Sequence, residues 1–278
     1  MLTQKVSKPT HTLVFHWSLP RRPRVGVKLQ KGTYHPIAYY RLIHGGGNME
    51  LKFNGSLVNA KIVLMSKLLD DEKRFNEAKA LLLQVHAWLH AREMAQSEEW
   101  SYQDSVLAEV TPATMRQVPQ KECHSIAWLL WHLTRCEDIT MNLLVAQSDQ
   151  VLLSGNWPEK LNIPWRDTGN AMNPEEIAHF SQTIDLDALL AYRMAVGRRT
   201  REIISQVTVD TVHQKVKPAG IQRIFDEGAV VEAARGVADY WSKRDHAGLF
   251  LMPATRHILT HLKEAQEIRK KILRMKND

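Results

Sequence analysis

Three histidines occupy positions from which their imidazoles could meet on one metal ion. His257 and His261 are four residues apart in a segment with helical periodicity, so both rings would lie on one helix face, one turn apart. His132 lies within an apolar segment, and a neutral imidazole buried there needs partners for both ring nitrogens. Three imidazoles suit Zn, Ni, Fe or Cu rather than Ca or Mg. Three protein ligands would leave open positions for water or substrate, which is the pattern of a reactive metal site.

Each of these histidines also has an ordinary structural explanation. Two histidines on one helix face, such as His257 and His261, are more often surface residues or hydrogen-bonded core residues than metal ligands. His132 could make one hydrogen bond to a neighbouring backbone or side-chain group. From spacing alone, the metal site and the satisfied core therefore both remain open.

Four further residues could contribute to such a site. Cys136 follows His132 by one helical turn, so its thiol could point to the same centre, although a free cysteine on a buried helix is usually inert packing. Glu137 could accept a hydrogen bond from a ligand histidine and fix its tautomer, or could lie at the surface or cap a helix. His246 could line the pocket or make a loop hydrogen bond. Trp128 could wall an apolar substrate pocket or pack in the core.

The elements that would position these residues are helices. Apolar residues recur at intervals of three and four from about residue 60 onward, which is typical of amphipathic helices. The pattern predicts four long helices, over residues 67–94, 125–145, 186–207 and 254–275. Ser125 is the expected N-cap of the second of these, and Met252-Pro253 is expected to open the last.

Long connections separate the predicted helices. Residues 98–122 contain two prolines, and a second connection ends where Asn173 is expected to cap a helix that starts at Pro174. Residues 218–247 are expected to hold one or two short helices. We see no internal repeat and no sustained heptad. The predicted fold class is therefore all-α, a four-helix bundle with long crossover connections.

Composition excludes several classes of protein. None of the apolar runs in the 278 residues approaches the ~18 residues that a membrane-spanning helix needs, so no membrane partner is expected. The two cysteines, Cys123 and Cys136, cannot build a disulfide framework, as expected for a protein of the reducing cytosol. No glycine-rich phosphate loop, nucleophile elbow or paired CxxC motif is present. We therefore expect a cytoplasmic protein without nucleotide-binding, serine-hydrolase or zinc-ribbon function.

The positive charge of the chain is concentrated at one end. The formal net charge is +7, yet residues 1–49 contain eight Lys and Arg and no Asp or Glu, so the remainder is nearly neutral. A nucleic-acid-binding domain would carry a basic face of its own, and we expect no nucleic-acid partner.

Residues 1–49 are interpreted as a basic, disordered extension outside the fold, because they have no helical period and contain four prolines and a Gly-Gly-Gly run. A transit peptide and a basic arm for anionic partners are two explanations. We favour a third, a start codon chosen too early, with Met49 as the natural start.

Two blocks of sequence resemble a known family. SIAWLLWHLTRCED (residues 125–138) resembles the second-helix signature of the DinB-like (damage-inducible) metal-binding four-helix bundles, and GLFLMPATRHILTHLKEAQEIRKKI (residues 248–272) resembles their fourth-helix signature. Both blocks occur in the family's order, and the resemblance covers residues 60–275 as one DinB-like helical domain. It implies that His132, His257 and His261 are the three metal ligands.

The resemblance also implies a range of functions. Characterised relatives include thiol-dependent transferases and a thiol-dependent isomerase, in which the metal is thought to bind and activate the thiol. We therefore expect a metal-dependent enzyme of the thiol-transferase or hydrolase type, with Zn or Ni as the ion and a small-molecule thiol or electrophile as the substrate. The alternative is a non-catalytic, metal-stabilised helical stress or interaction protein. A homodimer is possible in either case.

Overall fold

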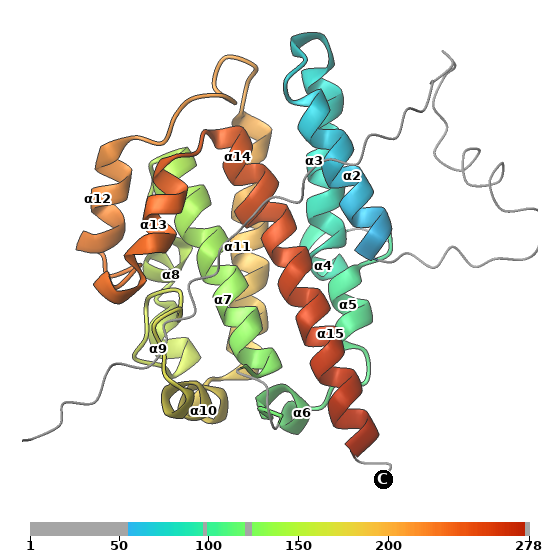
Figure 1. The fold of residues 1–278 in the computed structure, drawn as a ribbon, viewed down its shortest axis with the longest axis vertical. Helices are drawn as coiled ribbons and strands as arrows, with labels where there is room; N and C mark the ends of the chain where they lie inside the picture. The colour runs from blue at the N-terminus through green and yellow to red at the C-terminus, as the bar shows by residue number, and fades with distance from the viewer. Residues whose placement is uncertain (1–54, 97–98, 120–123, 276–278) are drawn as a thin grey trace, which may run out of the picture. The chain divides into compact units, whose positions relative to one another are not determined.

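The computed structural model describes residues 55–96, 99–119 and 124–275. Their regular structure is helical (Figure 1), and these residues contain no strand apart from an isolated bridge between Lys215 and Asp245. The all-α fold is confirmed. The expectations for residues 1–49 and for Cys123 lie outside the described residues. None of the helices in the described part has the length and apolar character needed to cross a bilayer.

The prediction of one helix over residues 67–94 is wrong. The chain forms α2 (Gly55–Leu68), a 3₁₀ turn η1 (Glu72–Arg74) and then α3 (Phe75–Trp88), and α2 packs against α3. Asp71 causes the break, because its backbone is extended and its side chain accepts a hydrogen bond from the Lys73 N–H at 3.0 Å. The apolar periodicity continues across the turn, and periodicity alone therefore could not reveal it.

The predicted helix over residues 125–145 is confirmed, with a change of winding inside it. Its first part is α7 (Ile126–Asp138), and the Ser125 hydroxyl accepts a hydrogen bond from the Trp128 N–H at 3.0 Å, as expected of an N-cap. The chain then widens into the π-helical segment η2 (Ile139–Ala146). Every residue of α7 is buried, because this helix packs against both α11 (Leu186–Gln206) and α15 (His257–Met275).

Two other helix starts agree with the sequence. The prediction of a helix over residues 186–207 is confirmed by α11. The helix α10 (Pro174–Thr183) begins with Pro174 after a capping box, in which Asn173 and Glu176 each bond the other's backbone N–H. These starts were predictable because caps are local signals.

The last helix starts earlier than predicted. Helical turns begin at α14 (His246–Leu251), where the Asp245 side chain accepts a hydrogen bond from the Gly248 N–H at 2.8 Å. Pro253 does not open the helix but lies in the π-helical turn η4 (Met252–Arg256), and α15 follows. Proline has no N–H to donate and its ring crowds the preceding turn, and a π-helical turn accommodates both effects.

Shorter elements occupy the connections. Within these, α12 and α13 confirm the short helices predicted for residues 218–247. The elements are α4 (Arg92–Ala95), α5 (Tyr102–Leu107), α6 (Pro112–Arg116), α8 (Val151–Ser154), α9 (Trp157–Leu161), α12 (Pro218–Asp226), η3 (Glu232–Ala234) and α13 (Arg235–Ser242).

Candidate metal centre

The structure brings the three predicted histidines together where α7 meets α15. His132 lies in the middle of α7, while His257 and His261 lie on one face of the first two turns of α15. The Nε2 atom of His257 is 3.2 Å from the Nε2 of His132 and 3.2 Å from the Nε2 of His261. Three ring nitrogens from two helices thus face one another. We call these residues the first cluster.

The outer nitrogens of two of these rings are held by acceptors. His132 Nδ1 donates to the Thr168 carbonyl oxygen at 2.8 Å, and His261 Nδ1 donates to Glu264 Oε2 at 3.0 Å. A carbonyl oxygen can only accept, so Nδ1 of His132 must carry the hydrogen and Nε2 is left with its lone pair. Metal-ligating histidines are oriented in this way by carboxylates and carbonyls. The Nδ1 of His257 is buried without a partner among the described residues.

Burial keeps the imidazoles of His132 and His257 neutral. It lowers the pKa of His132 to about 3, and the neighbouring His261 acts in the same direction. Burial also holds the pKa of His257 well below its usual value, with His261 and His132 contributing. A metal ion binds the neutral form of imidazole, so the first cluster is electrostatically prepared for a cation.

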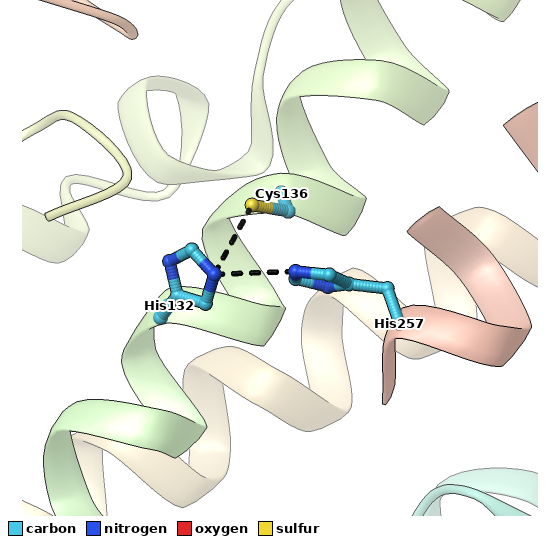
Figure 2. Close-up of side chains that lie close together, drawn as sticks. All are labelled: His132, Cys136 and His257. Atoms are coloured by element: carbon cyan, nitrogen blue, oxygen red, sulfur yellow. Dashed lines mark hydrogen bonds between the residues drawn. The ribbon is translucent and has the colours of Figure 1, made fainter. Parts of the chain in front are cut away.

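Cys136 adds a sulfur atom to the first cluster. Its Sγ lies 4.0 Å from His132 Nε2 (Figure 2), and its donor atom and those of His132 and His257 all lie within 4.8 Å of one another. Burial raises the pKa of the thiol to about 12, against the opposite influence of Arg135. The thiol is therefore protonated in the absence of a cation, and only a bound metal would ionise it near neutral pH.

Glu264 is a site residue that the sequence reasoning missed. Its Oε1 accepts a hydrogen bond from His124 Nδ1 at 2.9 Å, and its Oε2 accepts the one from His261 Nδ1. Burial alone would raise the pKa of Glu264, but the hydrogen bonds from His124 and His261 outweigh it and hold the pKa at about 2. Its spacing of three residues from His261 was the available signal, because such residues are neighbours on a helix.

Trp128 forms one wall of the first cluster. Its ring stacks between His124, with ring centroids 3.9 Å apart, and His132, with centroids 4.9 Å apart. The side chain is buried, which confirms that Trp128 packs in the core, while its role as the wall of a substrate pocket stays a prediction. This stacking restricts the orientation of the His132 ring.

Two candidates lie elsewhere. Glu137 is fully buried, so the surface alternative is wrong, and its carboxylate contacts His86 and His90 of the α3 side. His246 is the first residue of α14, about three helical turns before His257, and its backbone N–H donates to the Gln214 carbonyl at 3.0 Å. Adjacent residues on a helix point about 100° apart, so the spacing already indicated that Glu137 and Cys136 face different directions.

Comparison with known proteins gives one family. A family model described as the DinB superfamily matches residues 95–233, half of the chain. The match includes His132 and ends before His257 and His261. A solved structure, the conserved protein of locus from Enterococcus faecalis, is 18% identical over 75% of this chain and 94% of that chain, with a TM-score of 0.46. A search of curated proteins gave no match.

Proposed function

This chain belongs to the DinB superfamily, and from that membership and the histidine geometry we propose that it binds one divalent metal ion through His132, His257 and His261. The observation that carries the proposal is the convergence of three Nε2 atoms, with two of the rings anchored through Nδ1 by the Thr168 carbonyl and by Glu264. Zn and Ni both accept this donor set.

The residues around the first cluster suit a small-molecule reaction. A bound divalent ion lowers the pKa of a coordinated thiol or water and so supplies a nucleophile near neutral pH. The Thr168 carbonyl and Glu264 would hold the ligand rings in place during ligand exchange. The His261 side chain keeps 15% of its surface exposed, which supports access from solvent. We propose transfer of a small-molecule thiol to an electrophile, or hydrolysis of a small substrate.

Cys136 supports a second candidate function. Structural metal sites have four protein ligands, whereas catalytic sites keep a position open. If the Cys136 thiolate joined the three histidines, the coordination sphere would be closed. The protein would then be a non-catalytic, metal-stabilised helical protein.

Metal analysis tests the proposed site. Zinc content is measured after purification in chelator-treated buffer for the wild type, for His257→Ala and for the matched control His246→Ala, which removes a buried histidine outside the first cluster. We expect loss of one equivalent in His257→Ala alone, with a modest drop in melting temperature. Equal metal content in all three proteins would contradict the proposal.

Two further measurements separate the candidate functions. Conjugation of low-molecular-weight thiols to a model electrophile is assayed with the metal-loaded wild type and with His257→Ala; activity only in the wild type supports the enzyme. The visible spectrum of the cobalt-substituted protein is compared with that of Cys136→Ser. A thiolate-to-cobalt charge-transfer band that disappears in Cys136→Ser, together with no conjugation, would favour the closed structural site.

A further inference from the structure

A second histidine pair with the spacing of the first lies at the end of α3, with His86 in its last turn and His90 just beyond it. His86 and His90 are four residues apart, and their rings lie side by side with centroids 4.3 Å apart. Both face Glu137, which α7 presents on the side turned towards α3. We propose that His86, His90 and Glu137 form a second divalent-metal site, separate from the first cluster and independent of the proposed function. We call these residues the second cluster.

The donor atoms of the second cluster are already at ligand distances. Nε2 of His86 lies 2.7 Å from Glu137 Oε1, and Nε2 of His90 lies 3.1 Å from Glu137 Oε2. All three donor atoms lie within 4.8 Å of one another. A tetrahedral zinc ion with bonds of about 2.0–2.1 Å holds its ligand atoms about 3.3–3.4 Å apart. The His90–Glu137 distance of 3.1 Å would need to open by about 0.2–0.3 Å, and the His86–Glu137 distance of 2.7 Å by about 0.6–0.7 Å.

The unpaired atoms of the second cluster indicate a missing partner. Nε2 of His90 and Oε2 of Glu137 are 3.1 Å apart, yet neither has a hydrogen-bond partner among the described residues. Both residues are fully buried, and buried polar atoms are nearly always satisfied. Ligands of one ion lie at this separation and point at the ion rather than at each other. A cation between them would satisfy both atoms.

The outer nitrogens of the two rings can take up the hydrogen when a metal binds. The Nδ1 atoms of His86 and His90 have no hydrogen-bond partner in the described part of the chain. In the metal-free protein the Glu137 carboxylate can only accept, so Nε2 of His86, 2.7 Å from Oε1, carries the hydrogen. A metal ion that binds the Glu137 oxygens would displace this hydrogen bond, and the hydrogen would move to the partnerless Nδ1, which leaves Nε2 with a lone pair for the ion. Two imidazoles and one carboxylate suit zinc and its neighbours in the transition series rather than calcium or magnesium.

A glycine makes room for one of these rings. A Cβ added to Gly197 of α11 would lie 2.8 Å from His90 Nδ1 and 2.9 Å from Met94 Cγ. The ring of His90 therefore rests against the bare backbone of α11. This contact holds Nε2 of His90 towards Glu137.

Arg193 sets an expectation for the strength of the second site. Its Nη1 lies 3.9 Å from Glu137 Oε2, while its guanidinium donates to Gln103 Oε1 at 2.5 Å and to the Leu89 carbonyl at 2.8 Å. The oxygens of Glu137 are thus not occupied by Arg193, but its positive charge opposes a second cation. We expect weaker binding here than at the first cluster.

Zinc stoichiometry tests the proposal. Protein expressed in zinc-supplemented medium is analysed for zinc per chain as the wild type, as His257→Ala, as His90→Gln and as the control His246→Gln. Two equivalents are expected in the wild type and in the control, and one in each of the other two variants. Circular dichroism and a thermal melt verify that each variant is folded.

Two results would overturn the second site. One is a folded His90→Gln that holds as much zinc as the wild type. The other is a folded His257→Ala that holds none, and this result decides the matter even if His90→Gln fails to fold. Failure of the first cluster looks different, because His257→Ala would then keep the full wild-type content while His90→Gln lost zinc.

Discussion

The two histidine clusters contain similar residues, but the hydrogen-bond acceptors lie on different sides of their imidazole rings. Each combines a histidine pair of i,i+4 spacing with a residue of α7: His257 and His261 meet His132, and His86 and His90 meet Glu137. In the first cluster the anchoring acceptors lie outside, on Nδ1, so the Nε2 atoms face each other. In the second cluster the acceptor lies in the middle and faces the Nε2 atoms. The position of the acceptor therefore decides whether an imidazole offers a lone pair or an N–H group.

Burial separates the clusters further. Both imidazoles and the carboxylate of the second cluster are fully buried, whereas the His261 side chain of the first keeps 15% of its surface exposed. Ligands can exchange with solvent only where solvent reaches. We therefore propose that exchange of ligands with solvent belongs to the first cluster and that the second contributes to stability, and the following changes test that division.

Removing the charge of Glu137 is expected to have the largest effect. In metal-free protein, Glu137→Gln leaves the buried guanidinium of Arg193 without its nearest anion. Breaking a buried charge pair costs on the order of 3 kcal/mol of unfolding free energy. Urea denaturation measures the loss. Glu264→Gln is the matched control beside the first cluster and should lose clearly less unfolding free energy, because Glu264 is partly exposed. Equal losses would contradict the difference in burial that we infer between the clusters.

Filling the space beside His90 is expected to have the second-largest effect. Gly197→Ala places a methyl group against His90 and Met94, and such overpacking costs about 2 kcal/mol. Gly236→Ala is the control, because a Cβ at that position of α13 meets nothing within 4 Å. Thermal melts compare both variants with the wild type, and zinc at the first cluster should be retained in each. An unchanged melting temperature in Gly197→Ala would show that His90 is not held by α11.

The sequence predicted the elements better than it predicted their interruptions. Caps such as Ser125 and Asn173 are local signals, and the structure has helices that begin there. The break at Asp71 was not predicted, because the apolar periodicity continues through it. The predicted helix start at Pro253 was wrong, because a π-helical turn accommodates a proline inside a continuous helix.

The sequence likewise predicted some residues of the candidate sites and missed others. Spacing brought His257 and His261 to one face, and the apolar surroundings of His132 indicated burial, although the ligand role of the three stays a prediction. His86 and His90 have the same spacing and were overlooked among the apolar residues in and just after α3. Their partner, Glu137, is 47 residues further along the chain than His90. Only the folded structure, in which Glu137 of α7 contacts both rings, reveals that contact.

Weakening the anchor of His261 is expected to lower metal affinity with little loss of stability. Glu264→Gln keeps the shape of the side chain but removes the charge that holds His261 Nδ1. Loss of such an outer partner typically lowers metal affinity about tenfold or more. Competition with a chromogenic zinc chelator measures the affinity. Glu267→Gln, on an exposed face of α15, is the control and should leave the affinity unchanged. If both variants bind alike, the anchor plays no part.

The smallest expected effect comes from the residue behind that anchor. His124→Asn removes one of the two hydrogen bonds to Glu264 and the stacking contact on Trp128, but leaves the bond to His261 intact. A partly exposed hydrogen bond contributes about 0.5 kcal/mol, so we expect about a twofold loss of zinc affinity in the same competition assay. The second cluster should keep its zinc, because none of its residues contacts His124. A loss as large as that of Glu264→Gln would mean that His124 controls the position of Glu264, and the outer part of the first cluster would then be as tightly coupled as the buried second one.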